Sequence, residues 1–226
     1  MDYEELREAA QKIYSTATSS SFEYPDSKDK LFDGNSPRSI YNVCITETRG
    51  ANFAYSSGYL IGAKLLSRMA IFTRCNIDQL IYPIIFMYRH YLEIILKDLI
   101  RQGLNIKGET PDQILTDVLN GHNLMKLWNK FKPFFEEVSG RNESFSEVRK
   151  GVESYLNQIN KVDPESMAFR YEKTKDRSRA SLSGEINVNI VDFCNKMEKL
   201  TGLLEGVSCE FSEAESWASE MRSEQW

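Results

Sequence analysis

The residues best suited to do chemistry lie on one predicted helix, in the stretch FMYRHYLEIILKDLIRQ from Phe86 to Gln102. At about 100° per residue, Arg89, Glu93 and Lys97 rise on successive turns of one side, and His90 falls within the same sector. An arginine and a lysine together can bind an anion, and a histidine can exchange protons near neutral pH. The remaining circumference is apolar, which predicts that this helix lies centrally in a bundle.

Two interpretations of this polar stripe are open from the sequence. In the first, the stripe faces solvent and stabilises the helix only through a Glu93–Lys97 pair, which contributes roughly 0.2–0.5 kcal/mol. In the second, it faces a cleft in which Arg89 and Lys97 bind an anion and His90 transfers protons. The second interpretation predicts that replacing Arg89 with alanine abolishes activity but leaves the thermal stability nearly unchanged.

Two later segments carry further candidates. In GHNLMKLW, His122 stands at a helix start, where free backbone N–H groups favour an anion. In MAFRY, Arg170 is flanked by aromatic residues that can anchor the backbone while the guanidinium reaches outward. The ordinary alternatives are a capping or packing role for His122 and a surface ion pair for Arg170. The candidate catalytic residues are Arg89, His90 and His122, and the candidate ligand-binding residues are Glu93, Lys97, Arg170 and Tyr171.

Composition limits the classes of function. The 226 residues are 41% hydrophobic and 27% charged, an ordinary globular balance, and their net charge of -5 argues against a broadly basic nucleic-acid binder. Cys44, Cys75, Cys194 and Cys209 show neither zinc-ligand spacing nor a disulfide framework. Because phosphate-loop motifs and metal-binding carboxylate clusters are also unrecognisable, we expect no metal and no cofactor.

The sequence predicts a cytoplasmic protein without a membrane segment. The charged amino terminus MDYEELREAAQK cannot serve as a secretory signal. The longest apolar run, LIYPIIFMY, is far shorter than the roughly 20 residues that a membrane-spanning helix needs.

Hydrophobic periodicity predicts an all-α fold, a single-domain helical bundle with at most a small β-hairpin. We expect an N-terminal helix and irregular arm over 1–50, the bundle over 51–208, and an acidic C-terminal tail with helical potential over 209–226. The arm includes a candidate short strand in IYNVCITETRG, and the segment after Asp163–Pro164 is expected to be an exposed hairpin or loop. Gly103 is expected to end the helix that carries the polar stripe, and the last long helix is expected to end near Val207.

Taken in order, YRHYLEIILK, GHNLMKLW and DPESMAFRY, followed by a final amphipathic helix, resemble the HEPN superfamily of bacterial helical proteins (higher eukaryotes and prokaryotes nucleotide-binding). The resemblance covers about Leu80 to Leu204. It implies an α-helical bundle that often dimerises, and a role in toxin–antitoxin or antiphage defence, where many members are metal-independent ribonucleases. Those ribonucleases place a histidine four to six residues after an arginine, but the matching positions here hold Ile94, Ile95 and Leu96.

Two functions therefore remain open. The first is a HEPN-like defence or toxin–antitoxin protein that binds RNA or a nucleotide at the Arg/His site, with cleavage left open because the motif is incomplete. The alternative is a non-catalytic interaction subunit that forms a homodimer or docks onto a larger effector, with Trp217 and Trp226 as partner anchors. A small-molecule enzyme that uses His90 as its base is a third, less favoured interpretation.

Overall fold

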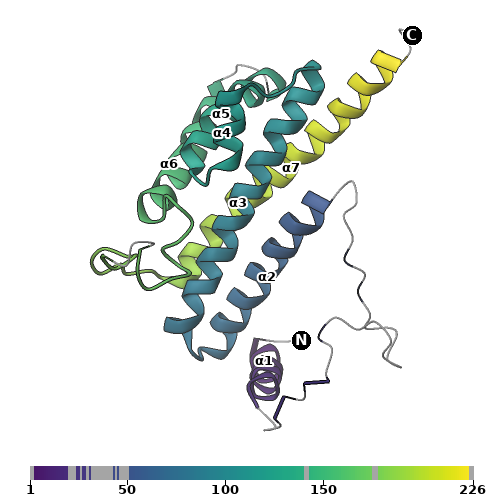
Figure 1. Ribbon diagram of the computed structural model, residues 1–226. Coiled ribbons are helices and arrows are strands. Elements are labelled where there is room, and N and C mark those ends of the chain that lie inside the picture. Colours follow the sequence, from purple (N-terminus) through teal and green to yellow (C-terminus); the bar gives the residue numbers. More distant parts are fainter. Residues whose placement is uncertain are drawn as a thin grey trace.

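The computed structural model describes residues 3–19, 24, 25, 27, 28, 31, 43, 45, 51–139, 143–174 and 178–223. Over these residues the chain forms helices and no sheet, which confirms the predicted all-α bundle (Figure 1). The only strand-like pairing in this part of the chain is an isolated antiparallel bridge between Lys173 and Ala180. The helices are α1 (Tyr3–Thr18), α2 (Ala51–Thr73), α3 (Ile77–Lys107), α4 (Gln113–Asn120), α5 (Leu124–Ser139), α6 (Glu143–Val162) and α7 (Ile190–Ser223).

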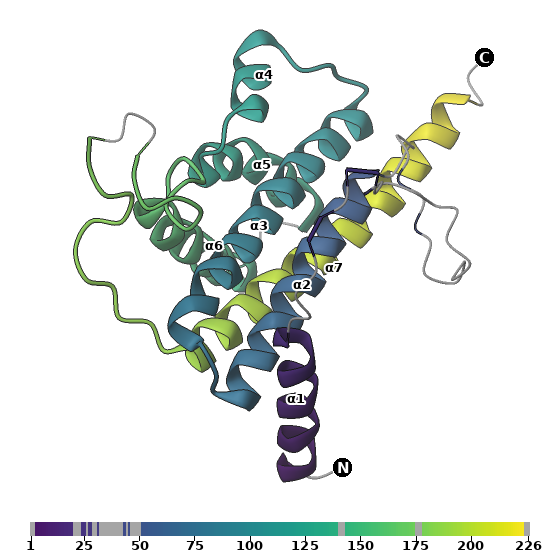
Figure 2. The same ribbon diagram turned by 60° about the horizontal axis from the view of Figure 1, so that its bottom comes forward.

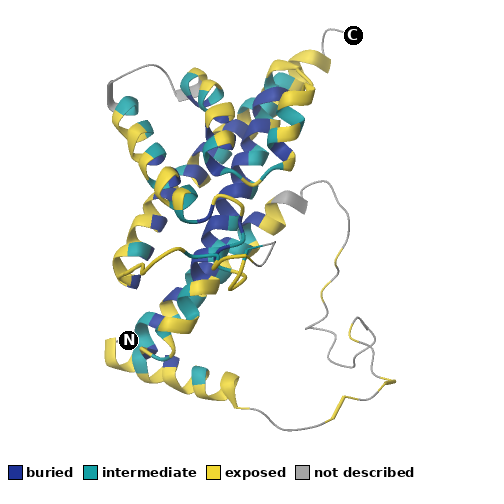
Figure 3. Ribbon diagram, turned by 60° about the vertical axis from the view of Figure 1, so that its left-hand side comes forward, coloured by how far each residue is buried: buried dark blue, intermediate teal, exposed yellow. Residues whose placement is uncertain are grey.

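The central helix is α3, as predicted from the apolar residues around most of its circumference. It packs against α2, α5 and α7, and the buried residues gather along it (Figures 1 and 3). The helix α7 runs parallel to α3. Gln102 donates a hydrogen bond to Ser212 and Asn105 donates one to Glu215, so the paired residues follow in the same order along both helices. The helix α2 lies alongside both and runs in the opposite direction (Figure 2). None of the described helices combines the length and the apolar character that a membrane span requires.

The predicted end of α3 at Gly103 is wrong. The helix continues through Gly103 to Lys107, and Gly108 caps it in the left-handed conformation with a φ of 67°. Gly103 serves packing instead, because a Cβ atom there would stand 2.6 Å from Cγ of Phe134 on α5. A glycine inside a helix thus marks a close helix–helix approach here, a role that local sequence cannot distinguish from a cap.

The predicted end of the last helix near Val207 is also too early. The helix α7 continues as one 34-residue element to Ser223, since no glycine or proline follows Gly206 to interrupt it. Phe211 in this extension is fully buried, whereas Trp217 is 70% exposed. The candidate strand of the arm is largely outside the described residues, and Trp226 lies outside them entirely.

The close approach at Gly103 gives a first prediction. We expect Gly103→Ala to lower the free energy of unfolding by roughly 1–3 kcal/mol, because the added methyl group must displace the Phe134 ring. In the matched variant Gly202→Ala, on α7, no atom lies within 4 Å of the new Cβ. That variant should gain about 0.5–1 kcal/mol from helix propensity. Urea unfolding followed by circular dichroism measures both, and equal effects in the two variants would contradict the packing role of Gly103.

Candidate functional site

Arg89, the first candidate catalytic residue, is completely buried. Its exposed fraction is 0%. Nε donates a hydrogen bond to the backbone oxygen of Asp163 at 3.1 Å, Nη1 donates to Oε2 of Glu93 at 2.9 Å, and Nη2 donates to the backbone oxygen of His122 at 2.6 Å. The guanidinium on α3 therefore ties together the residue that follows α6 and the segment that precedes α5.

The charges around Arg89 balance one another. Glu93 is 3% exposed, and its Oε1 accepts a hydrogen bond from Nζ of Lys97 at 2.8 Å and lies 2.9 Å from Nδ1 of His122. Oδ2 of Asp163 lies 3.3 Å from Nε of Arg89. Arg89 and Lys97 thus offset the two carboxylates, which is the condition for keeping charged groups in an apolar interior. We refer to Arg89, Glu93, Lys97, His122 and Asp163 as the ion network.

Asp163 is a member that the sequence did not reveal. In the sequence, Asp163 precedes Pro164, and this pair predicts only the end of a helix. It does not indicate that Asp163 has a charged partner. Besides its contact with Arg89, its Oδ1 accepts hydrogen bonds from the backbone N–H groups of Met167 at 2.7 Å and Ala168 at 3.0 Å. Asp163 therefore shapes the turn after α6 while it neutralises the arginine.

Burial and hydrogen-bond partners shift the pKa of Glu93 in opposite directions. Burial alone would raise the pKa of this carboxyl, since desolvation disfavours the charged form. The hydrogen bonds from Lys97 and His122, together with their charges, outweigh burial and lower the pKa of Glu93 below its ordinary value. Glu93 is therefore a carboxylate at neutral pH and acts as the acceptor at the centre of the ion network.

The Glu93–Lys97 pair of the first interpretation is present at 2.8 Å, but the stripe around it is not solvated. Arg89 and Glu93 are buried rather than solvated, and the side chain of Lys97 retains only 15% of its exposure. The stripe faces no cleft at Arg89, because the end of α6 and the segment before α5 cover it. A helical wheel shows which residues share a side, but it cannot show which distant segments cover that side. The catalytic role of Arg89 stays a prediction, and its guanidinium is already occupied by protein acceptors.

His90 lies beside the ion network in an aromatic setting. Its ring stands 4.4 Å from the ring of Tyr59 on α2, edge to face, and is stacked 5.5 Å from the ring of Phe86. Burial lowers the pKa of His90, and nearby arginine and lysine charges lower it further, although Glu93 acts in the opposite direction. The imidazole is therefore neutral at physiological pH, which suits a packing residue or a base and not an anion-binding cation.

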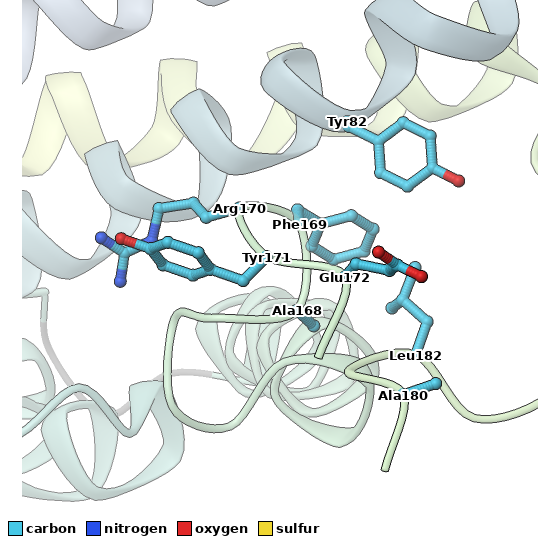
Figure 4. A pocket seen from close by; sticks show the side chains of 8 residues that line it. All are labelled: Tyr82, Ala168, Phe169, Arg170, Tyr171, Glu172, Ala180 and Leu182. Atoms are coloured by element: carbon cyan, nitrogen blue, oxygen red, sulfur yellow. The ribbon is translucent and has the colours of Figure 1, made fainter. Parts of the chain in front are cut away.

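Arg170 and Tyr171 join the same aromatic group from the segment after α6. The guanidinium carbon of the exposed Arg170 lies 5.2 Å from the ring centre of Phe86 and 5.4 Å from that of Tyr171. Its Nε donates a hydrogen bond to the backbone oxygen of Ser166 at 2.7 Å, which holds the side chain in place. In Figure 4, Arg170 and Tyr171 lie side by side and turn away from Tyr82. We refer to Tyr59, His90, Phe86, Arg170 and Tyr171 as the aromatic ladder.

The candidate site therefore divides into two adjacent groups on α3. Arg89, Glu93, Lys97 and His122 converge in the buried ion network, whereas His90, Arg170 and Tyr171 belong to the aromatic ladder. The network reaches solvent through the side chains of Lys97, which is 15% exposed, and His122, which is 48% exposed. Among the described residues, no three His, Cys, Asp or Glu side chains are placed to hold a metal ion.

The chain shows no significant match to any protein-family model, any curated protein or any solved structure.

The ion network gives a second prediction, which replaces the expectation that Arg89 is dispensable for stability. We expect Arg89→Met to lower the free energy of unfolding by about 3–5 kcal/mol, because Glu93 and Asp163 lose the charge that neutralises them in the interior. Lys97→Met should cost less than Arg89→Met, because Glu93 keeps its hydrogen bond from Arg89. Urea unfolding measures both variants.

A further variant separates orphaned charge from lost volume. Adding Glu93→Gln to Arg89→Met removes one of the unpaired carboxylates, so the double variant should recover part of the lost stability. A loss of under 1 kcal/mol for Arg89→Met would contradict the proposed role of Arg89 as the central tie of the fold.

Proposed function

We propose that this chain is a HEPN-like, non-catalytic interaction subunit that pairs with a second copy of itself through the outer face of α2. The observation that carries the proposal is the apolar character of that face. The inner face of α2 is buried in the core through Leu60, Ala63 and Ala70. On the opposite side, Ile61 is 56% exposed and Leu65 is 59% exposed.

The exposed residues of α2 form a continuous stripe. Ala54, Gly58, Ile61 and Leu65 are separated by four, three and four residues, the spacing of a coiled-coil seam, and all four are exposed. Further along the same side, Phe72 packs against Tyr3 of α1 at 5.8 Å between ring centres. The helix α1 thus shows that this side accepts another helix, while the stripe from Ala54 to Leu65 stays uncovered by the described residues.

The order of residues along the stripe fits a second copy of the same helix. Its first two residues are small and its last two are large. If two α2 helices pack antiparallel about a two-fold axis, Ala54 of one copy lies opposite Leu65 of the other, and Gly58 lies opposite Ile61. Each large side chain then meets a small one at every level, which allows close packing, and a two-fold axis makes the same patch serve both subunits.

The occupied state of Arg89 supports a subunit without catalytic activity. A metal-independent ribonuclease needs a cationic group that can reach a phosphate. Here the guanidinium of Arg89 is enclosed and bonded to protein acceptors from Glu93, His122 and Asp163. These residues hold the fold together in the proposed subunit.

The self-association gives a third prediction. We expect the wild-type chain to form a dimer whose population rises with concentration, and Ile61→Glu/Leu65→Glu to be monomeric, because the charges would be buried in the interface. Gly58→Glu should have the same effect without disturbing the monomer, since no atom lies within 4 Å of the added Cβ. Light scattering coupled to size-exclusion chromatography measures the mass over a dilution series.

The matched control is Ile114→Glu on α4, where the original side chain is 66% exposed and lies outside the stripe. This variant should dimerise like the wild type. A monomeric wild-type chain at every concentration, or a dimer that survives all three α2 substitutions, would rule out the proposed interface.

A second candidate function, binding of RNA or a nucleotide without cleavage, is favoured by the aromatic ladder. The exposed guanidinium of Arg170 lies close to the rings of Phe86 and Tyr171. Aromatic rings beside a cation are typical of single-stranded nucleic-acid sites. His122, which precedes α5 and is 48% exposed, contacts Glu93 on the same helix that carries His90. On this hypothesis, Arg170 and Tyr171 contact the ligand, and the ion network only positions α3.

This candidate gives a fourth prediction. We expect Arg170→Ala to weaken binding of a fluorescein-labelled single-stranded RNA roughly tenfold and to reduce the slope of log affinity against log salt by about one, because one phosphate contact is lost. Arg68→Ala, an exposed arginine on α2, should leave both unchanged. Fluorescence anisotropy over a salt series measures the effect.

The same assay separates the two candidate functions. Wild-type RNA affinity that Arg170→Ala leaves intact would contradict the aromatic ladder as the binding surface. Cleavage of the RNA by the wild-type chain, lost in His122→Ala, would overturn the non-catalytic assignment.

A further inference from the structure

We propose that a groove beside α7 binds a medium-chain carboxylate, that is, a free amphiphile with an apolar chain and one anionic head. The groove has a volume of ≈ 220 Å³ and is formed by α3, α6, the start of α7 and the segment that joins α6 to α7. It shares no residue with the stripe on α2 or with the ion network, so this proposal is independent of the proposed function.

The interior of the groove is apolar. Ile85 and Met197, which are 7% and 3% exposed, belong to its lining together with Ile159 and Phe193. Val188 also lines the groove and is 40% exposed, although it is apolar. Concave sites for small molecules are mostly apolar with few polar groups, and this groove has that composition.

The volume sets the size of the apolar body. An engineered protein cavity of about 150 Å³ accepts benzene, which has six heavy atoms. By proportion, the groove accommodates about nine heavy atoms, and an eight-carbon chain with its head at the opening meets that limit. Longer chains would leave their ends in water and gain little from further methylene groups.

The charge of the head group follows from Lys196. Among the residues that the structure describes, Lys196 is the only charged member of the lining and has no ion-pair partner. It is exposed at the surface of α7. An ammonium at the edge of an apolar groove attracts a carboxylate and repels a cationic head. Tyr155 and Gln158 on α6 also belong to the lining, and the Gln158 amide donates a hydrogen bond to Oγ of Ser154 at 3.2 Å. The groove therefore combines an apolar body site with a cationic head site.

The test uses octanoate as the probe, with octylamine hydrochloride and 1-octanol as chain-matched cationic and neutral probes. Chemical-shift titration of the full chain, labelled at its Ile, Val and Met methyl groups, reports both the affinity and the place of binding. We expect octanoate to bind with a roughly millimolar dissociation constant, as a ligand of about ten heavy atoms allows. The largest shifts should occur at Ile85, Ile159, Val188 and Met197.

Two variants and one control complete the test. Lys196→Gln should weaken octanoate binding roughly threefold to fivefold, because a solvent-exposed ion pair is lost, and should leave 1-octanol binding unchanged. Lys199→Gln, the matched control one turn away and outside the groove lining, should change neither. Val188→Trp should abolish binding of octanoate and 1-octanol by filling the groove.

The outcomes are decisive in either direction. Octylamine binding as tight as octanoate binding would overturn the role of Lys196. Octanoate shifts that lie elsewhere, or that persist in Val188→Trp, would overturn the site itself. If the α2 dimer is absent but the octanoate shifts appear in the groove, only the proposed function fails.

Discussion

The fold depends on keeping one positive charge inside an apolar core. The guanidinium of Arg89 has lost all contact with water, so its stability there rests on acceptors that come from three separate stretches of sequence. Its neighbour Glu93 lies one turn away, whereas His122 and Asp163 lie 33 and 74 residues further along the chain. Because Asp163 also shapes the turn that follows, the position of the segment carrying Arg170 depends on the same charge balance.

Periodicity was sufficient to predict the helices, and the central place of α3, because apolar spacing records which side of a helix is buried. Asp112 shows how reliable a local signal can be. The sequence Thr-Pro-Asp is a typical helix start, and the Asp112 side chain caps α4 by accepting a hydrogen bond from the N–H of Leu115 at 2.7 Å. Gly103 shows the limit, because a glycine that admits the Phe134 ring looks the same in sequence as one that ends a helix. The convergence of Arg89 with Asp163 could not be predicted, since it depends on the tertiary path of α6.

Functional sites usually expose charged residues to a ligand, but here Arg89 and Glu93 are buried and large apolar residues are exposed. Arg89 and Glu93, which suggested chemistry, are inside the bundle and satisfy each other, whereas apolar residues of α2 and of the groove beside α7 remain at the surface. Interior charges of this kind specify an arrangement of helices, whereas exposed apolar surfaces favour association. The buried polar groups therefore account for the arrangement of the helices, and the exposed apolar surfaces carry the proposals for binding. The aromatic ladder is the intermediate case, with an arginine exposed on aromatic supports.

The parallel course of α3 and α7 has an electrostatic consequence. The C-terminal ends of α3 and α7 lie at the same side of the molecule (Figure 1). There, Nη1 of Arg222 donates a hydrogen bond to the backbone oxygen of Ile106 at 3.3 Å. The last carbonyl groups of a helix lack partners within it, and the aligned peptide dipoles place about half a negative charge there. Two such termini add to the carboxylates of the α7 extension, Glu210, Glu213, Glu215 and Glu220. Lys107 in the last turn of α3 and Arg222 in the last turn of α7 place positive charge at these two termini, where it offsets the aligned dipoles.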